Sequence, residues 1–401
     1  MRGPFKKFIE RLVQGVLMIS SSVTTLTVLL IIIYLFKEAS GIFTMSPVES
    51  GYTLLVNKDN PVRKLDAEHI KNIFDGNILN WKEVGGTDQD IQIFRIDDIS
   101  NYYTEAELGE NFEHLADKVD EYVSLHPEVL AFVPDKYILP DTKAIKINVD
   151  KITVKKLFKT KDWFPTATPA AQLGILPLIL GTFWVSLGAI VLALPFGLAA
   201  AIYMAEIADY RLRNILKPLI ELLAGIPSVV YGFFGLVVIV PFIQRTFNLP
   251  VGESAFAGSI LLGIMALPTI ITISEDSIRN TPRPMKEASL ALGANHWQTI
   301  LRVIIPYSIS GISAAVILGI GRAIGETMAV LMVTGNAAVI PHSFLEPIRT
   351  IPATIAAELG EAPFGGLHFK MLFLLGCILF IITLLINFCV ELIAPKRRTE
   401  R

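Results

Sequence analysis

The chain has 401 residues, of which 52% are hydrophobic and 18% are charged, and its mean hydropathy is +0.54. A soluble domain carries roughly 25% charged residues, so this composition argues against an ordinary water-soluble enzyme. The formal net charge of −2 excludes a nucleic-acid binder that works through a basic surface. The charge is unevenly spread, because residues 37–166 hold 39 of the 72 charged side chains. The sequence therefore predicts a polar domain inserted into a membrane protein.

The first apolar stretch covers residues 13–36 and follows several basic residues. Its length exceeds the 7–15 residues that are usual in the apolar core of a signal peptide, and no small-residue cleavage site follows it. We therefore expect a retained transmembrane helix.

The polar insertion, residues 37–166, has the pattern of an α/β domain. Alternating and apolar residues predict strands at 52–56 and 91–95 and a short strand at 131–133. A helix is expected near 67–74 with Asp66 as its cap, and one or two helices are expected over 105–125.

Five further stretches are apolar and long enough to span a membrane: 172–205, 217–243, 255–274, 304–334 and 370–393. Basic residues gather in 1–12, 206–216, 275–303 and 394–401, whereas the connections 244–254 and 335–369 hold one each. This distribution predicts that both termini are cytoplasmic and that the insertion lies outside.

The cytoplasmic loop between the fourth and fifth spans has the form of a docking element. Glu287–Leu292 favours a short helix, Gly293 can end it in a left-handed turn, and Pro306 marks the entry into the fifth span. A plain connection on the membrane surface is the alternative interpretation. A short exposed helix can seat in a groove of a soluble partner.

The spacing of this loop resembles the EAA loop of ABC-importer permeases. The matching residues are Glu287, Ala288, Gly293 and Pro306, and Ser289 stands in place of the third alanine. The resemblance implies that residues 275–303 form a coupling loop that contacts a separate ATPase subunit. The residues it implies for this contact are Glu287, Ala288, Ser289, Gly293 and Ala294.

The fifth span contains two charged residues, Arg322 and Glu326, four positions apart. On a continuous helix they would be neighbours on one face, and charges inside a membrane usually face a cavity or a partner. Two interpretations stay open. The residues form a structural ion pair, or they belong to an anion path in which Arg322 meets the anion and Glu326, with Thr327, orients it.

The run Gly321–Val330 resembles the fifth-span motif of phosphate-importer permeases, and residues 335–362 resemble the external loop of the PstC type. The resemblance covers about 170–395 well. It implies six transmembrane helices in the type I ABC importer permease fold, with the α/β domain inserted between the first two. It also implies partners: a homologous second permease (PstA-like), a cytoplasmic ATPase dimer (PstB-like) and an external phosphate-binding protein (PstS-like).

The insertion is similar to one lobe of phosphate-binding proteins, through Ile73–Gly76, Asn80-Trp81 and Arg95. That family follows the corresponding arginine with Ser-Gly-Thr, whereas here Asp97 and Asp98 precede Ser100 and the glycine is absent. Arg95 and Ser100 would be a vestigial anion site. A docking or spacer role is the favoured interpretation.

The sequence contains no P-loop, metalloprotease motif, nucleophile elbow or Cys/His cluster. These absences argue against an enzyme, a cofactor and a metal site. The resemblance implies a transport subunit that is not itself an enzyme, located in the bacterial inner membrane. The expected domains are 1–36, the insertion 37–166, a permease core 167–395 and a tail 396–401. Another oxyanion (molybdate, tungstate or sulfate) is the alternative substrate, and a membrane-anchored ligand sensor is a second class of function.

Overall fold

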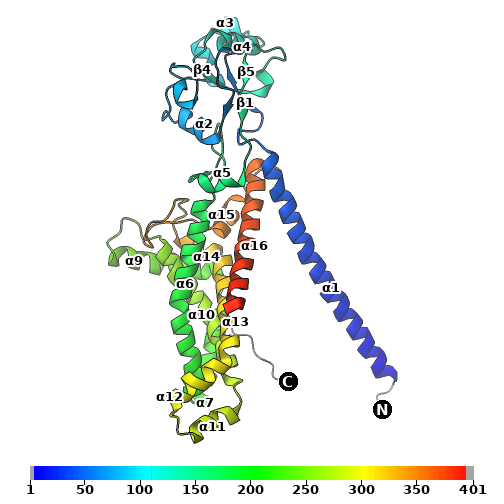
Figure 1. Ribbon diagram of the computed structural model, residues 1–401, viewed down its shortest axis with the longest axis vertical. Helices are drawn as coiled ribbons and strands as arrows, with labels where there is room; N and C mark the ends of the chain where they lie inside the picture. The colour runs from blue at the N-terminus through cyan, green and yellow to red at the C-terminus, as the bar shows by residue number, and fades with distance from the viewer. Residues whose placement is uncertain (1–3, 110, 394–401) are drawn as a thin grey trace. The chain divides into compact units, whose positions relative to one another are not determined.

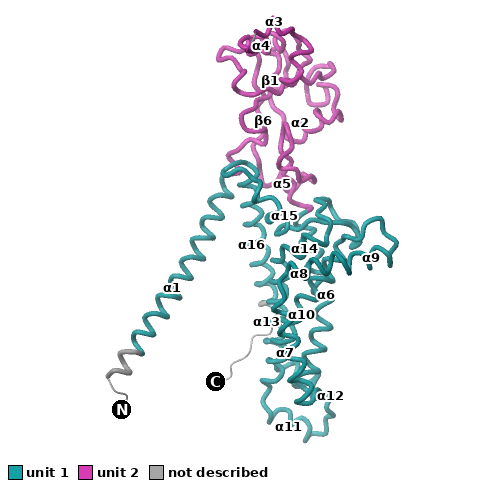
Figure 2. The backbone as a smooth tube through the Cα atoms, turned by 180° about the vertical axis from the view of Figure 1, so that it is seen from behind, with its two compact units in different colours: residues 1–41, 178–401 teal, residues 42–177 magenta. Residues whose placement is uncertain are grey.

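The computed structural model describes residues 4–109 and 111–393, which form two compact units (Figures 1 and 2). We call residues 42–177 the insertion unit, and residues 1–41 with 178–401 the helical unit. The predicted tail 396–401 and Arg2, which contributed to the expected orientation, lie outside the described residues.

The insertion unit is built on a four-stranded sheet with the strand order β3-β4-β1-β5, in which β3 and β4 are parallel and the other neighbours are antiparallel. Its strands are β1 (Tyr52–Val56), β2 (Lys64–Leu65), β3 (Gln92–Arg95), β4 (Val129–Pro134), β5 (Ile145–Lys146), β6 (Asn148–Val149), β7 (Trp163–Phe164) and β8 (Gln172–Leu173). Its helices are α2 (Ala67–Phe74), α3 (Glu105–Leu108), α4 (Leu115–Leu125) and α5 (Val154–Lys159).

Both faces of this sheet are covered, which explains the nearly continuous apolar sequence of β4. On one face Leu130 and Phe132 pack with Leu54 and with Ile70 of α2. On the other face a second cluster forms around α4, listed here by its main members: Leu55, Phe94, Val119, Tyr122, Ala131 and Val133. The predicted α/β insertion is therefore confirmed, including the helix that begins after the cap Asp66, whose carboxylate accepts from the backbone N of His69.

The helical unit contains α1 (Pro4–Ser40), α6 (Leu176–Ile202), α7 (Tyr210–Ala224), α8 (Ser228–Phe234), α9 (Val240–Thr246), α10 (Ala255–Arg279), α11 (Arg283–Ala291), α12 (His296–Thr299), α13 (Ile305–Gly325), α14 (Met328–Val333), α15 (Ile351–Glu358) and α16 (Leu367–Ile393). Short π-helical turns at Tyr203–Ile207, Gly235–Ile239 and Ile300–Ile304 extend α6, join α8 to α9 and lead into α13. In the described part of the chain, six helical stretches are long and apolar enough to cross a membrane, as predicted.

The core of the helical unit is centred on α10. Within its most apolar stretch 61% of the residues are buried, whereas the corresponding stretch of α1 has none. Leu261 and Met265 of α10 pack with Val185 of α6, Tyr231 of α8 and Val330 of α14. α10 is therefore the most deeply buried of the six long apolar helices in the described chain.

Two predicted helix boundaries are wrong. The third span was expected to begin at residue 217, but residues 217–224 belong to α7, a separate amphipathic helix that ends before Pro227. The fifth span was expected to continue to residue 334, but α13 ends at Gly325 and α14 begins at Met328. Apolar composition alone does not reveal either break, because it is nearly uniform across both.

Candidate functional site

The predicted docking loop folds as two short helices, α11 and α12, joined by a tight turn. Gly293 has φ +89°, the left-handed conformation that favours glycine, and its N–H donates to the Leu290 carbonyl at 2.9 Å. Asn295 then caps α12, because its side chain accepts from the backbone N of Gln298 while the Gln298 side chain accepts from the backbone N of Asn295. The predicted helix and its left-handed end are both present.

The exposed side of this loop is apolar. Leu292 is 90% exposed, Trp297 58% and Leu301 59%. A shallow groove runs beside α11, lined by Met285, Ala288, Ser289, Leu292, Ala294 and Val303. Glu287 lies on the exposed part of α11, and its carboxylate has no partner among the described residues. Three of the five residues implied by the EAA resemblance, Ala288, Ser289 and Ala294, thus line one groove, and Gly293 makes the turn beside it.

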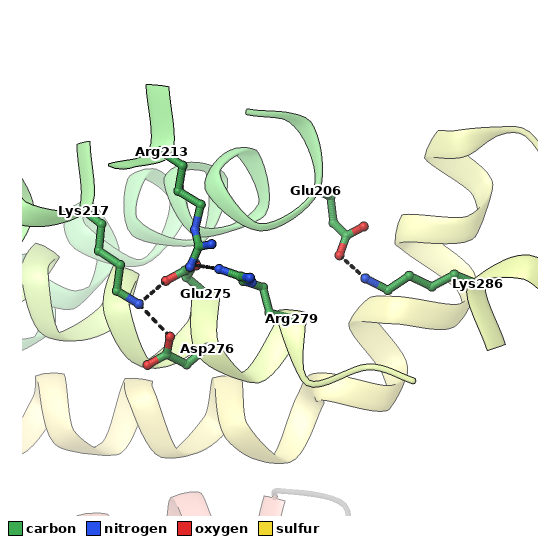
Figure 3. A network of polar contacts seen from close by, with 7 residues as sticks. All are labelled: Glu206, Arg213, Lys217, Glu275, Asp276, Arg279 and Lys286. Carbon is green, nitrogen blue, oxygen red and sulfur yellow. Dashed lines mark hydrogen bonds and ion pairs between the residues drawn. The ribbon is translucent and has the colours of Figure 1, made fainter. Parts of the chain in front are cut away.

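The loop is fastened to the rest of the helical unit on its inner side. Lys286 of α11 forms an ion pair with Glu206, on the π-helical turn after α6 (Figure 3). The Ser289 and Thr299 hydroxyls are hydrogen-bonded at 2.9 Å, which joins α11 to α12. Ile300 and Ile304 are buried in a cluster with Ile278 at the end of α10. These contacts hold α11 against the end of α6 and hold the π-helical turn after α12 against α10.

A buried carboxylate organises the neighbouring helix ends. Glu275, near the end of α10, is fully buried and is surrounded by three cations from α7 and α10 (Figure 3). Arg213 approaches its Oε1 at 2.6 Å and Lys217 its Oε2 at 2.8 Å, while Arg279 lies at 3.5 Å. Since a buried charge must be paired, this cluster ties α7 to α10.

Lys217 bridges two carboxylates in this cluster, because its Nζ lies 2.8 Å from both Glu275 and Asp276. Burial lowers the pKa of Lys217, but the hydrogen bonds to Asp276 and Glu275 more than offset it, so the pKa is raised above the ordinary lysine value. In the sequence, Arg213 and Arg279 indicate only which side of the membrane their segments face. The signal that the sequence interpretation missed was the acidic pair Glu275-Asp276 at the end of an apolar span.

The two charged residues of the fifth span are not partners. Because α13 ends at Gly325, Glu326 has extended backbone (ψ 133°) and leaves the helix face that carries Arg322. Its Oε1 accepts from the backbone N of Ala329 at 3.4 Å, whereas the Arg322 guanidinium donates to the Thr269 hydroxyl of α10 at 3.5 Å. The predicted neighbour relation on one helix is therefore wrong.

The surroundings of Arg322 are open on one side. No ion pair to Arg322 occurs within residues 4–109 and 111–393. In the same described part of the chain, no atom beyond the adjacent residues and the helix's own nearby backbone lies within 4 Å of where a Cβ on Gly321 or Gly325 would stand. The Thr327 hydroxyl, in the break between α13 and α14, donates to the Gly325 carbonyl at 3.3 Å. This face of α13 has room for a second helix or for water.

In the insertion unit, the structure places Arg95 and Ser100 in different surroundings. The Arg95 guanidinium lies 5.3 Å from the centre of the Phe74 ring. It faces a cavity lined by Glu49, Tyr52, Phe74, Arg95, Ile96, Asp97, Phe132, Thr168 and Pro169, and Ser100 is not among these residues. Two carboxylates, Glu49 and Asp97, share the cavity with Arg95, and negative charge there opposes an anion.

These features define a class of protein: a multi-pass membrane protein with an exposed, partly apolar loop between two spanning helices. The sequence profile of the family described as "binding-protein-dependent transport system inner membrane component" matches residues 193–399, and that of a PBP superfamily domain matches residues 33–171. The chain belongs to the family of binding-protein-dependent transport system inner membrane components, and it carries a PBP-like insertion.

Relatives of the chain include permeases from several bacteria. It is 38% identical over 250 residues to the probable ABC transporter permease protein YqgH of Bacillus subtilis, covering 62% of this chain and 81% of that protein. It is 40% identical over 246 residues to the phosphate transport system permease protein PstC of Mesorhizobium japonicum, covering 57% and 74%. Among solved structures, an inward-facing MetNI methionine ABC transporter is 19% identical with a TM-score of 0.41, covering 55% of this chain and 92% of that chain.

Proposed function

We propose that this chain is one of two transmembrane subunits of an ATP-driven phosphate importer. Family membership makes it an inner membrane component of a binding-protein-dependent transport system. The observation that supports phosphate as the substrate is the 40% identity to a phosphate permease over 246 residues. The proposed partners are a homologous second permease, a cytoplasmic ATPase dimer and an external phosphate-binding protein.

We propose that the loop 275–303 receives the ATPase. Leu292 and Trp297 are large, exposed apolar side chains on this loop, and Leu292 lines the groove beside α11. On the inner side, Lys286 and Ser289 connect the same helix to α6 and α12. A displacement of α11 by the ATPase would therefore be transmitted to the spanning helices through these contacts.

We propose that the anion passes Arg322. An arginine inside a span is costly unless it faces water or a partner, and in the described chain its contact is one long hydrogen bond to Thr269. The backbone leaves helical geometry at Glu326 and Thr327, directly after this residue. Non-helical backbone at membrane depth is tolerated where it is buried in protein or lines a water-filled cavity. These observations support a path along α13, closed on the far side by the second permease.

The orientation belongs to the same proposal: both termini and the loop 275–303 are cytoplasmic, and the insertion unit is external, where we propose that it guides the binding protein. Labelling cysteines in sealed cells with an impermeant maleimide tests this. A cysteine replacing Leu79, 62% exposed in the insertion unit, should react from outside, and one replacing Leu292 should react only after permeabilisation. The reverse pattern would overturn the orientation.

Uptake by the reconstituted complex tests the substrate. The chain would be placed in proteoliposomes with a second permease, an ATPase and a phosphate-binding protein, and ATP-dependent uptake of labelled phosphate measured. Unlabelled phosphate should compete, whereas sulfate, molybdate and tungstate should not. Uptake of one of those oxyanions in place of phosphate would refute the phosphate assignment while leaving the importer class intact.

A further inference from the structure

The insertion unit carries a basic and apolar surface on the segment that leads into the second span. α5 and the residues beside it expose four lysines and three large apolar side chains. The lysines are Lys151, Lys155, Lys159 and Lys161, and the apolar side chains are Val154 (56% exposed), Phe158 (45%) and Phe164 (60%). We call these seven residues the α5 patch.

The α5 patch is held firmly from its inner side. Ile152, Leu157 and Trp163 alternate with the exposed residues along the segment and are nearly fully buried. The Leu157 carbonyl accepts from the backbone N of Ile175 at 3.1 Å. β7 and β8 form an antiparallel pair in which Trp163 lies opposite Leu173. The patch is therefore fixed to the residue that immediately precedes α6.

The start of α6 sets the level of this patch relative to a bilayer. α6 and the π-helical turn that extends it run from Leu176 to Ile207, 32 residues, which corresponds to a length of about 48 Å at 1.5 Å per residue. A bilayer with its headgroup regions is about 40–45 Å thick, so a helix of this length reaches both headgroup regions and its first residue, Leu176, lies at headgroup level. Since Ile175 is bonded to Leu157, α5 lies at that level too.

The charge of this segment is opposite to that of the domain around it. Residues 37–166 contain 23 acidic and 16 basic side chains, yet residues 151–164 contain five lysines and one aspartate. The adjacent carboxylates are already occupied, since Asp150 pairs with Lys64 and Lys156, and Asp162 pairs with Lys71.

The lysines of the α5 patch have no such partners. None of the four forms an ion pair within the part of the chain that the structure describes. Lys155 and Lys159 line a cavity together with Asp66 and Glu68, but no ion pair joins these lysines to those carboxylates. The four exposed amines of the α5 patch thus stay available to an external anion.

We propose that the α5 patch binds the anionic phospholipid headgroups that surround the second span and thereby fixes the insertion unit at the membrane surface. Lysines beside exposed apolar side chains are the composition of surfaces that lie in a membrane interface, where the apolar groups enter and the amines reach phosphates. A free phosphate ion would use the lysines but not Phe158, Val154 or Phe164. The combination therefore favours lipid over a dissolved anion.

The test uses the full chain in nanodiscs of phosphatidylcholine, with and without phosphatidylglycerol. A spin label is attached to Phe158→Cys, with exposed Cys389 replaced by serine, and its accessibility to oxygen and to a water-soluble nickel complex is measured. A label at Leu79→Cys, exposed on the same unit, is the reference. The variant K151Q/K155Q/K159Q/K161Q removes the patch charge. Its matched control, K58Q/K136Q/K143Q/K146Q, removes the same number of exposed lysines elsewhere on the unit.

With phosphatidylglycerol, the label at 158 should gain oxygen access and lose nickel access relative to the label at 79. That difference should be lost in the patch variant and kept in the matched control. Equal accessibility of both labels in every lipid would overturn the proposal. So would protection that appears in pure phosphatidylcholine only when inorganic phosphate or a binding protein is added, since the occupant would then be a free anion or a protein. Unchanged mobility of the reference label shows that the variants are folded.

Discussion

Removing the Glu275 carboxylate should destabilise the helical unit far more than removing its neighbour Asp276. Glu275 is fully buried and holds Arg213 and Lys217 at 2.6 and 2.8 Å. The variant Glu275→Gln leaves these cations close together without their main counter-charge. Breaking a buried ion pair by removing one partner costs about 3–5 kcal/mol. Because the Arg213 and Lys217 side chains keep 18% and 26% exposure, some of the freed charge would reach water, so we expect the lower end, about 3 kcal/mol.

Asp276 provides the matched control, because it binds the same Lys217 at the same 2.8 Å but its side chain is 56% exposed. An exposed pair contributes about 0–1 kcal/mol, so Asp276→Asn should have little effect. The assay is unfolding of the purified chain in mixed micelles, titrated with a denaturing detergent and followed by circular dichroism. Equal losses for the two variants, or no loss for Glu275→Gln, would refute the argument from burial.

Three further predictions concern other parts of the chain. Gly293→Ala should slow transport without preventing membrane insertion, because a side chain at φ +89° costs about 1–2 kcal/mol and would disturb the turn that positions α11. Full transport with normal ATP hydrolysis would contradict the proposal that transport depends on the position of α11. Arg322→Gln should abolish phosphate uptake in proteoliposomes while Arg322→Lys retains part of it, and equal activity of the two would argue against an anion contact. Asp150→Asn should lower the stability of the insertion unit at pH 7, and by progressively less as the pH falls below about 4. Hydrogen bonds from Lys156 and Lys64 lower the pKa of Asp150, so its stabilisation is present above the unfolded-state pKa and is lost as the pH falls through the lowered pKa. Thermal unfolding from pH 7 into the acid range tests this, and a difference that stays constant would contradict it.

The features that the sequence predicted correctly depend on local signals. The cap Asp66 and the left-handed Gly293 act through atoms within a few residues of themselves, so their residue types carry the information. The strands of the insertion unit likewise follow from runs of apolar residues, because both faces of the sheet are covered. The six apolar helices follow from length and composition.

The features that the sequence missed depend on breaks and on contacts between distant segments. The i, i+4 relation of Arg322 and Glu326 holds only on an unbroken helix, and nothing in the run around Gly325 is as disruptive as a proline. The pairing of Glu275 with Arg213 joins residues 62 positions apart. No periodicity within either helix reveals which cation meets which carboxylate.

The buried position of Glu275 restricts how the chain can change in length. α10 begins at the Ser254 cap, whose hydroxyl accepts from the backbone N of Ala257, and ends four residues after Glu275. A single residue inserted between these two points would turn the carboxylate by about 100° around the helix axis, away from Arg213 and Lys217. We therefore expect insertions and deletions between Ser254 and Glu275 to destabilise the protein and to be removed by selection. The connection between the first two spans, by contrast, accommodates a whole folded unit.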